Sequence, residues 1–142
     1  MKINNSILIL TVLLCATIFN SCKKEDEMKP PSISFKTGGS YISSSISLPA
    51  GSAVLIGIEA EKSESEGEEE DVLNHFNISR SLNGGTDVSV YNADLTSAQE
   101  EHYDYDFATI VSTTIGDTEK YTFTITNRDG LTGQINLTIT AQ

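Results

Sequence analysis

Apolar and polar residues alternate in short stretches from residue 32 almost to the C-terminus, and this alternation limits the folds open to the chain more than any other feature. A period of two places successive side chains on opposite faces of an extended segment, which is typical of β-strands with one buried face. One segment follows the pattern most strictly, with aromatic residues on one side and carboxylates on the other: Tyr103, Tyr105 and Phe107 against Asp104 and Asp106.

Applied along the chain, the same pattern predicts about seven strands, at residues 32–35, 52–61, 72–82, 88–90, 102–111, 120–126 and 134–140. Residues 46–48 are a candidate for a short extra edge strand that ends before Pro49. Asn83-Gly84-Gly85 and residues 127–130 (NRDG) favour tight turns, because asparagine and glycine tolerate a positive φ. No segment favours more than a short helical turn, so the natural architecture is an antiparallel β-sandwich over residues 32–142.

The final hairpin carries a family resemblance. Residues 121–130 (YTFTITNRDG), followed by an alternating last strand, resemble the last hairpin of PKD-type and other immunoglobulin-like domains on bacterial surfaces. The resemblance extends to the rest of the domain only through strand count and spacing. It implies an immunoglobulin-like β-sandwich in a broad group of binding and spacer modules, which fixes a fold better than a function.

A different kind of signal precedes the strands. Residues 7–19 (ILILTVLLCATIF) are almost wholly apolar, yet too few to span a bilayer as a helix, which needs about 20 residues. Ser21 and Cys22 follow, and then the charged residues 23–27 (KKEDE). This arrangement resembles a bacterial lipoprotein signal of the Bacteroidota type, in which the cysteine thiol receives a lipid and an acidic cluster directs export to the surface. It implies lipidation of Cys22.

The lipoprotein interpretation divides the chain into a signal peptide at 1–21, a tether at 22–31 and the domain at 32–142. The alternative is a secreted protein cut near Ser21 with Cys22 as a spare thiol. Cysteine usage argues against it: Cys15 would leave with the signal, so Cys22 could form no internal disulfide. Lipidation explains both the presence and the position of Cys22.

Charge narrows the classes of partner. The chain has 9 basic and 20 acidic residues, and loss of Lys2 with the signal would leave a net charge of −12. Such a chain lacks the basic footprint of a nucleic-acid-binding protein and cannot bind a membrane surface through charge. The predicted membrane contact is therefore the lipid anchor at Cys22 alone.

No pattern for catalysis stands out. The acidic run at 64–71 contains the only metal candidates, Glu68, Glu69, Glu70 and Asp71, and these are weak because calcium prefers spaced oxygen ligands. Asp104 and Asp106 are expected on a solvent face, and the two histidines, His75 and His102, on separate strands. We therefore predict no enzyme activity, no cofactor and no metal ion. Tyr41 and Tyr91 are the only tyrosines without an obvious place in the core. Two such residues are only a weak indication of a sugar-binding surface.

If the strands run up and down, residue 32 starts at the same end as the loops 62–71, 92–101 and 127–130, so the acidic end faces the tether. The sequence thus predicts an outer-membrane lipoprotein, exposed at the cell surface or alternatively facing the periplasm. It would act as a non-enzymatic binding or assembly module with an unknown protein or glycan partner; the resemblance implies a role beside polysaccharide uptake or adhesion. The alternative function is a calcium-dependent adhesive module. A small hydrolase is the third and least favoured interpretation.

Overall fold

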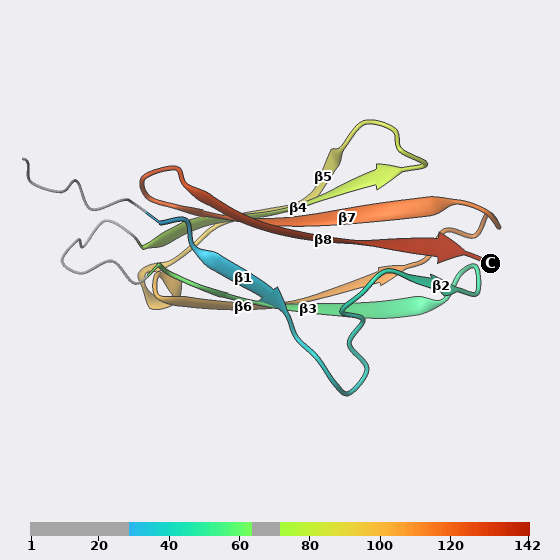
Figure 1. The fold of residues 1–142 in the computed structure, drawn as a ribbon, viewed down its shortest axis with the longest axis horizontal. Coiled ribbons are helices and arrows are strands. Elements are labelled where there is room, and N and C mark those ends of the chain that lie inside the picture. The colour runs from blue at the N-terminus through green and yellow to red at the C-terminus, as the bar shows by residue number, and fades with distance from the viewer. Residues whose placement is uncertain (1–28, 64–71) are drawn as a thin grey trace, which may run out of the picture.

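The computed structural model describes residues 29–63 and 72–142, which form two packed β-sheets (Figure 1). Its elements in chain order are β1 (Ser32–Phe35), β2 (Ile46–Leu48), β3 (Ala53–Glu61), β4 (Leu73–Leu82), β5 (Val88–Asp94), a 3-10 turn η1 (Ser97–Gln99), β6 (His102–Ile110), β7 (Thr118–Asn127) and β8 (Thr132–Ala141). The all-β prediction is confirmed, including the short helical turn in the stretch 92–101. Residues 46–48 form a strand of their own, which makes eight strands rather than about seven.

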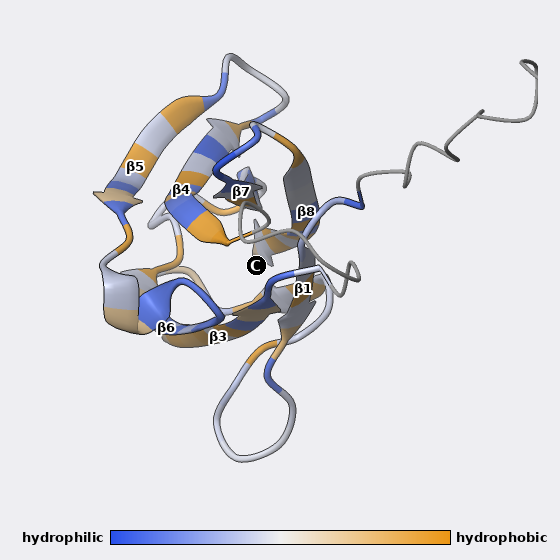
Figure 2. Ribbon diagram, turned by 90° about the vertical axis from the view of Figure 1, so that its left-hand side faces the viewer, coloured by the Kyte–Doolittle hydropathy of each residue, from blue (hydrophilic) through white to orange (hydrophobic). Residues whose placement is uncertain are grey.

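The two sheets differ in width. One has three strands in the order β1-β3-β6, and the other has five in the order β2-β8-β7-β4-β5. Neighbouring strands are antiparallel except for β2, which runs parallel to β8. Viewed along the strands, the two sheets lie face to face (Figure 2). The molecule is a two-layer sandwich, as the alternation predicts.

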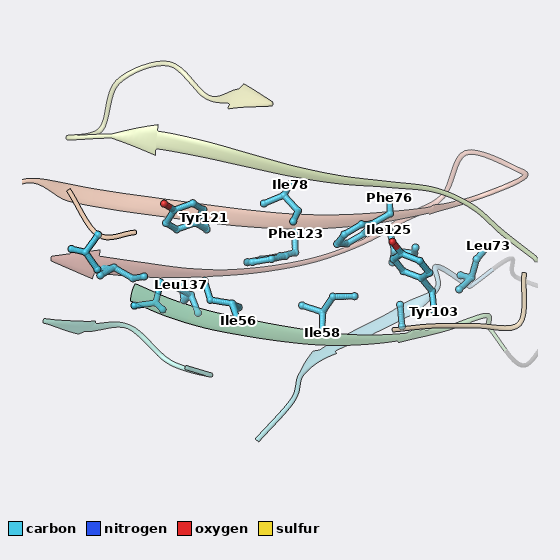
Figure 3. Close-up of a cluster of buried hydrophobic side chains, with 14 of the residues drawn as sticks. Ile56, Ile58, Leu73, Phe76, Ile78, Tyr103, Tyr121, Phe123, Ile125 and Leu137 are labelled. Carbon is cyan, nitrogen blue, oxygen red and sulfur yellow. The ribbon is translucent and has the colours of Figure 1, made fainter. Parts of the chain in front are cut away.

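Side chains from both inner faces fill the space between the sheets (Figure 3). Alternate residues of β3, β4, β7 and β8 supply most of this core, and the large ones that are almost wholly buried include Ile56, Ile58, Phe76, Ile78, Tyr121, Phe123, Ile125 and Leu137. All of these inward positions agree with the alternation in the sequence. Aromatic pairs connect the layers: the Phe35 and Phe123 rings meet edge to face at 5.7 Å, and Phe107 lies 5.5 Å from Tyr121. Burial of these apolar surfaces is the main source of stability.

One residue expected in the core is more open than predicted. Leu82 was expected beside Phe76 and Ile78, and its pairing with Glu119 does place it on the inner side of the five-stranded sheet. It is nevertheless 42% exposed, because it is the last residue of β4, next to the hairpin. At the other end of β4, a register shift between Leu73 and His75 turns Leu73 inward as well.

The sandwich has two ends. At the proximal end, where the chain enters β1, Ser32 pairs with Glu61, the Leu73 amide donates to the Glu100 carbonyl, and the Arg128 amide donates to the Val72 carbonyl. The distal end, opposite, holds the turns around Gly51, Asn83 and Gly116 and the C-terminal Gln142. The predicted grouping of loops is confirmed for the described residues. Residues 64–71 lie outside the described part.

The entry point itself is closely packed. Gly133 of β8 faces Pro31, the residue before β1, and a side chain at 133 would collide with the Pro31 carbonyl. Glycine is required here because the two backbones approach each other directly. Pro31 is correspondingly buried, so the domain begins firmly seated against β8.

Candidate functional site

The outer face of the three-stranded sheet carries a group of interacting polar side chains from three separate segments of the chain. Its centre is Gly57 of β3, which has no side chain. A Cβ there would lie 2.7 Å from Lys36 Cδ and 2.8 Å from Tyr41 Cε1, so both side chains lie directly over this glycine. Backbone hydrogen bonds from Lys36 to Gly57 and from Ile42 to Leu55, each 2.9 Å, hold the segment after β1 against the sheet.

Lys36 connects this segment to two carboxylates of β6. Its Nζ lies 3.1 Å from Asp104 Oδ1 and 3.1 Å from Asp106 Oδ1. The Tyr41 hydroxyl donates to Asp106 Oδ2 at 3.0 Å, and His102 Nε2 lies 2.7 Å from Asp104 Oδ2. We call these five residues the Lys36 cluster. Asp104 and Asp106 were expected on the solvent face, and they do lie there, but the bonds to Lys36 and Tyr41 were not foreseen.

The cluster fixes the charges of its members. Hydrogen bonding from His102, and then from Lys36, holds the pKa of Asp104 below its usual value. Desolvation opposes the charge on Lys36, but the hydrogen bonds to Asp106 and Asp104 outweigh it and raise the pKa of the amine. The hydrogen bond to Asp106 likewise raises the pKa of Tyr41. An amine held protonated and a carboxyl held ionised suit an ion-paired contact, because the two opposite charges attract each other at neutral pH.

The cluster gives a pH-dependent prediction. A carboxyl whose pKa is lowered on folding stabilises the folded state above the usual aspartate pKa, about 3.9, and this contribution is lost as the pH falls through the lower folded value. Asp104→Asn should therefore flatten the decline in unfolding free energy below about pH 4, measured by urea denaturation. At pH 7 its cost should stay below about 1 kcal/mol, because exposed ion pairs contribute little.

The control for this prediction is Asp129→Asn, which changes an exposed turn residue outside the cluster. Equal acid slopes for the parent chain and Asp104→Asn would contradict the role given to Asp104.

The second histidine has a separate environment. His75 Nδ1 lies 2.8 Å from Asp94 Oδ1 and its Nε2 lies 2.7 Å from Asn92 Oδ1, on the outer face of β4 and β5. His75 and His102 therefore belong to different sheets, and the side chains that bond to them are different. In the part of the chain that the structure describes, no group of three or more His, Cys, Asp or Glu residues could hold a metal ion.

One acidic residue missed in the sequence is buried at the distal end. Glu119 lies just before the predicted strand 120–126, but it is 2% exposed and its carboxylate lies 3.2 Å from Arg80 Nη1. Its Oε2 accepts a hydrogen bond from the Ser112 amide at 2.9 Å, and its Oε1 lies 3.4 Å from the Tyr121 hydroxyl. Extending the alternation of β7 back by one step from Tyr121 would have placed it inward.

The tyrosines are also more involved in packing than expected. The Tyr91 ring of β5 lies 4.4 Å from that of Tyr105, and Phe76 lies 5.1 Å from Tyr103. Desolvation, with the neighbouring Tyr91 hydroxyl, raises the pKa of both Tyr103 and Tyr105. Tyr91 was expected outside the core but bridges the two sheets. Tyr41 lies outside the core, as expected, and belongs to the Lys36 cluster.

Several predicted site residues cannot be placed. Cys22, the tether up to residue 28 and the calcium candidates Glu68, Glu69, Glu70 and Asp71 lie outside the described residues, so these remain predictions from sequence. Within residues 29–63 and 72–142, no helix is long and apolar enough to cross a membrane. The sequence matches no protein-family model and no curated protein.

Proposed function

We propose that this chain is an outer-membrane lipoprotein, anchored through Cys22, whose immunoglobulin-like domain is a non-enzymatic binding or assembly module. The strand order supports the immunoglobulin-like assignment. A three-stranded sheet faces a five-stranded one, and the chain passes from β1 in the first sheet to β2 in the second before the hairpins begin. Two sheets with such crossing connections are the arrangement of immunoglobulin-like sandwiches.

The observation that carries the proposal is the contrast between the two ends. The proximal end bears the carboxylates Glu61, Glu100, Glu101 and Asp129. The distal end bears most of the exposed large apolar side chains of the described residues: Leu82, Val88, Ile110 and Ile115, which are 42%, 60%, 62% and 75% exposed. A tether that enters beside Pro31 would turn the charged end toward the membrane and present the apolar end outward.

This orientation fits a tethered module. Anionic headgroups and the proximal carboxylates repel each other, within the screening length of about 8–10 Å, which favours an upright domain. Apolar side chains exposed at the free end are a common mark of protein interaction sites. Two or more acyl chains at Cys22 would anchor the protein stably, since each buried methylene contributes about 0.8 kcal/mol.

Mass spectrometry of the mature N-terminus, together with protease treatment of intact cells, tests the proposal. We expect an acylated Cys22 as the first residue and loss of the domain on protease treatment. A Cys22→Ala chain, which cannot be acylated, is the control and should leave the membrane fraction. An unmodified N-terminus in the culture medium would contradict the anchor, and complete protection from protease would favour the periplasmic side.

A further inference from the structure

The four strands at the sheet edges are not equally protected against pairing with another strand. An exposed edge presents unpaired backbone groups, and proteins commonly shorten it, bulge it or cover it. β1 and β2 have only 4 and 3 residues, and β5 has a register shift against β4 between Ile78 and Ser79. β6 differs from all three. Its nine residues pair with β3 without a register shift, and it contains neither proline nor lysine.

Nothing in the described residues pairs with the other side of β6. A row of backbone N–H and C=O groups between Tyr103 and Ile110 is therefore free to bond an added strand. This is the geometry of β-augmentation, in which an extended peptide adds to a sheet and main-chain hydrogen bonds supply much of the affinity.

A second, independent observation lies across from this edge. The β6 aromatic rings contact side chains of β7, β4 and β5: Phe107 meets Tyr121, Tyr103 meets Phe76, and Tyr105 meets Tyr91. β5 is the outermost strand of the wider sheet and lies on the same side of the sandwich as β6 (Figure 2). Among residues 29–63 and 72–142, the three-stranded sheet has no strand beyond β6 to pack against β5.

The inner face of β5 shows the consequence. Val88 pairs with Arg80, which lies opposite the inward-facing Tyr121, so Val88 is on the inner side of its sheet. It is nevertheless 60% exposed, and its neighbour Val90 is 41% exposed. One more strand beside β6 would satisfy the free backbone groups and cover Val88 at the same time.

The charge of the surface beside the β6 edge determines which kind of added strand would bind favourably. The outer face next to the edge carries Glu59 and Glu61 of β3 besides Asp104 and Asp106, and Lys36 is the lysine bonded to this group. A second copy would bring the same carboxylates against these, and the chain as a whole has a net charge of −11. Like charges on neighbouring strands are destabilising, whereas opposite charges are favourable.

We propose that β6 is the docking edge for an extended segment of another protein, with lysine or arginine on its outward face and apolar residues on its inward face. This inference deepens the proposed function, because it gives the binding module a site and a class of partner. It does not depend on whether Cys22 is acylated.

The test uses a capped nine-residue peptide in which lysine and valine alternate, added to the full-length chain in mild detergent. We expect hydrogen–deuterium exchange to slow along 103–110, and binding to saturate. Val88→Lys should weaken binding about tenfold, because it places a charge against the apolar inward face of the peptide. Lys120→Ala, a change on an exposed residue of β7, should leave binding within about twofold.

Two control peptides separate the proposal from general charge attraction. One has glutamate in place of lysine, and the other has the same composition with all lysines before all valines, so that it cannot present two different faces. Any of three results would overturn the proposal. The block peptide could protect the amides equally well, or protection could be confined to strands other than β6. The third is no protection at about 1 mM alternating peptide, which would mean a binding free energy weaker than about 4 kcal/mol. So would a dimer with protected β6 amides in the absence of peptide, because the occupant would then be a second copy. The N-terminal mass, measured separately, shows whether the anchor itself has failed.

Discussion

Replacing Phe76 with alanine should lower the unfolding free energy by about 3–5 kcal/mol, as expected for removal of a large buried aromatic side chain. Phe76 is fully buried, and its ring lies 5.1 Å from Tyr103, 5.7 Å from Tyr105 and 6.0 Å from Tyr91. It therefore joins β4 to both β5 and β6, and the substitution removes contacts between the layers as well as apolar volume. Urea denaturation followed by circular dichroism measures the change.

Val90→Ala provides the matched control, since it also shortens an apolar side chain on this side of the sandwich but at a residue 41% exposed. Its cost should stay below about 1 kcal/mol, because much of the removed surface is already in water. A loss of less than about 1 kcal/mol for Phe76→Ala would show that the rings close over the space, and that Phe76 does not hold the two sheets together.

Glu119→Ala is the second substitution with a large expected effect, about 3 kcal/mol. The change leaves the Ser112 amide without its acceptor and Arg80 without its partner near the buried end of β7. Removing one member of a buried ion pair typically costs about 3–5 kcal/mol, and we expect the lower end because the Arg80 side chain is 42% exposed and can regain water. Thermal and urea unfolding of the variant measure this cost.

Two further variants separate charge from hydrogen bonding at this position. Glu119→Gln keeps an oxygen for the Ser112 amide, so its cost should fall between those of the parent and Glu119→Ala. Glu101→Ala removes an exposed partner of Lys62 and should cost much less than Glu119→Ala, because solvent screens exposed ion pairs. If Glu119→Ala were no more costly than Glu101→Ala, burial would contribute nothing to the importance of Glu119.

Features that depend on local interactions could be predicted from the sequence. Alternation is a local property, and it correctly predicted the strands and inward residues such as Phe123 and Leu137. The Asn83 turn was also predictable, because Asn83 has a φ of 53° and Gly84 a φ of 72°, as their residue types allow. Both predictions rest on residues close together in the chain.

Contacts between residues far apart in the chain could not be predicted from local sequence patterns. Lys36 meets Asp106 across 70 residues, and only the sheet order brings β1 and β6 to opposite sides of Gly57. The parallel pairing of β2 with β8 is equally non-local, because no local pattern states which strand a three-residue segment will join. The exposed Leu82 shows a third limit: alternation gives the face of a residue but not whether the facing sheet extends far enough to cover it.

The close seating of Pro31 against Gly133 has a mechanical consequence. The chain enters at the proximal end and finishes at the distal end, so tension between the two termini acts along the strands (Figure 1). The hydrogen bonds of β1 to β3, and of β8 to its neighbours, lie across that direction and are loaded together rather than one after another. When the domain is pulled by its N-terminus, the hydrogen bonds of β1 would thus resist the force in shear. The first residues of the domain are held by contacts to both sheets, so these bonds would not break one at a time from the end of the strand.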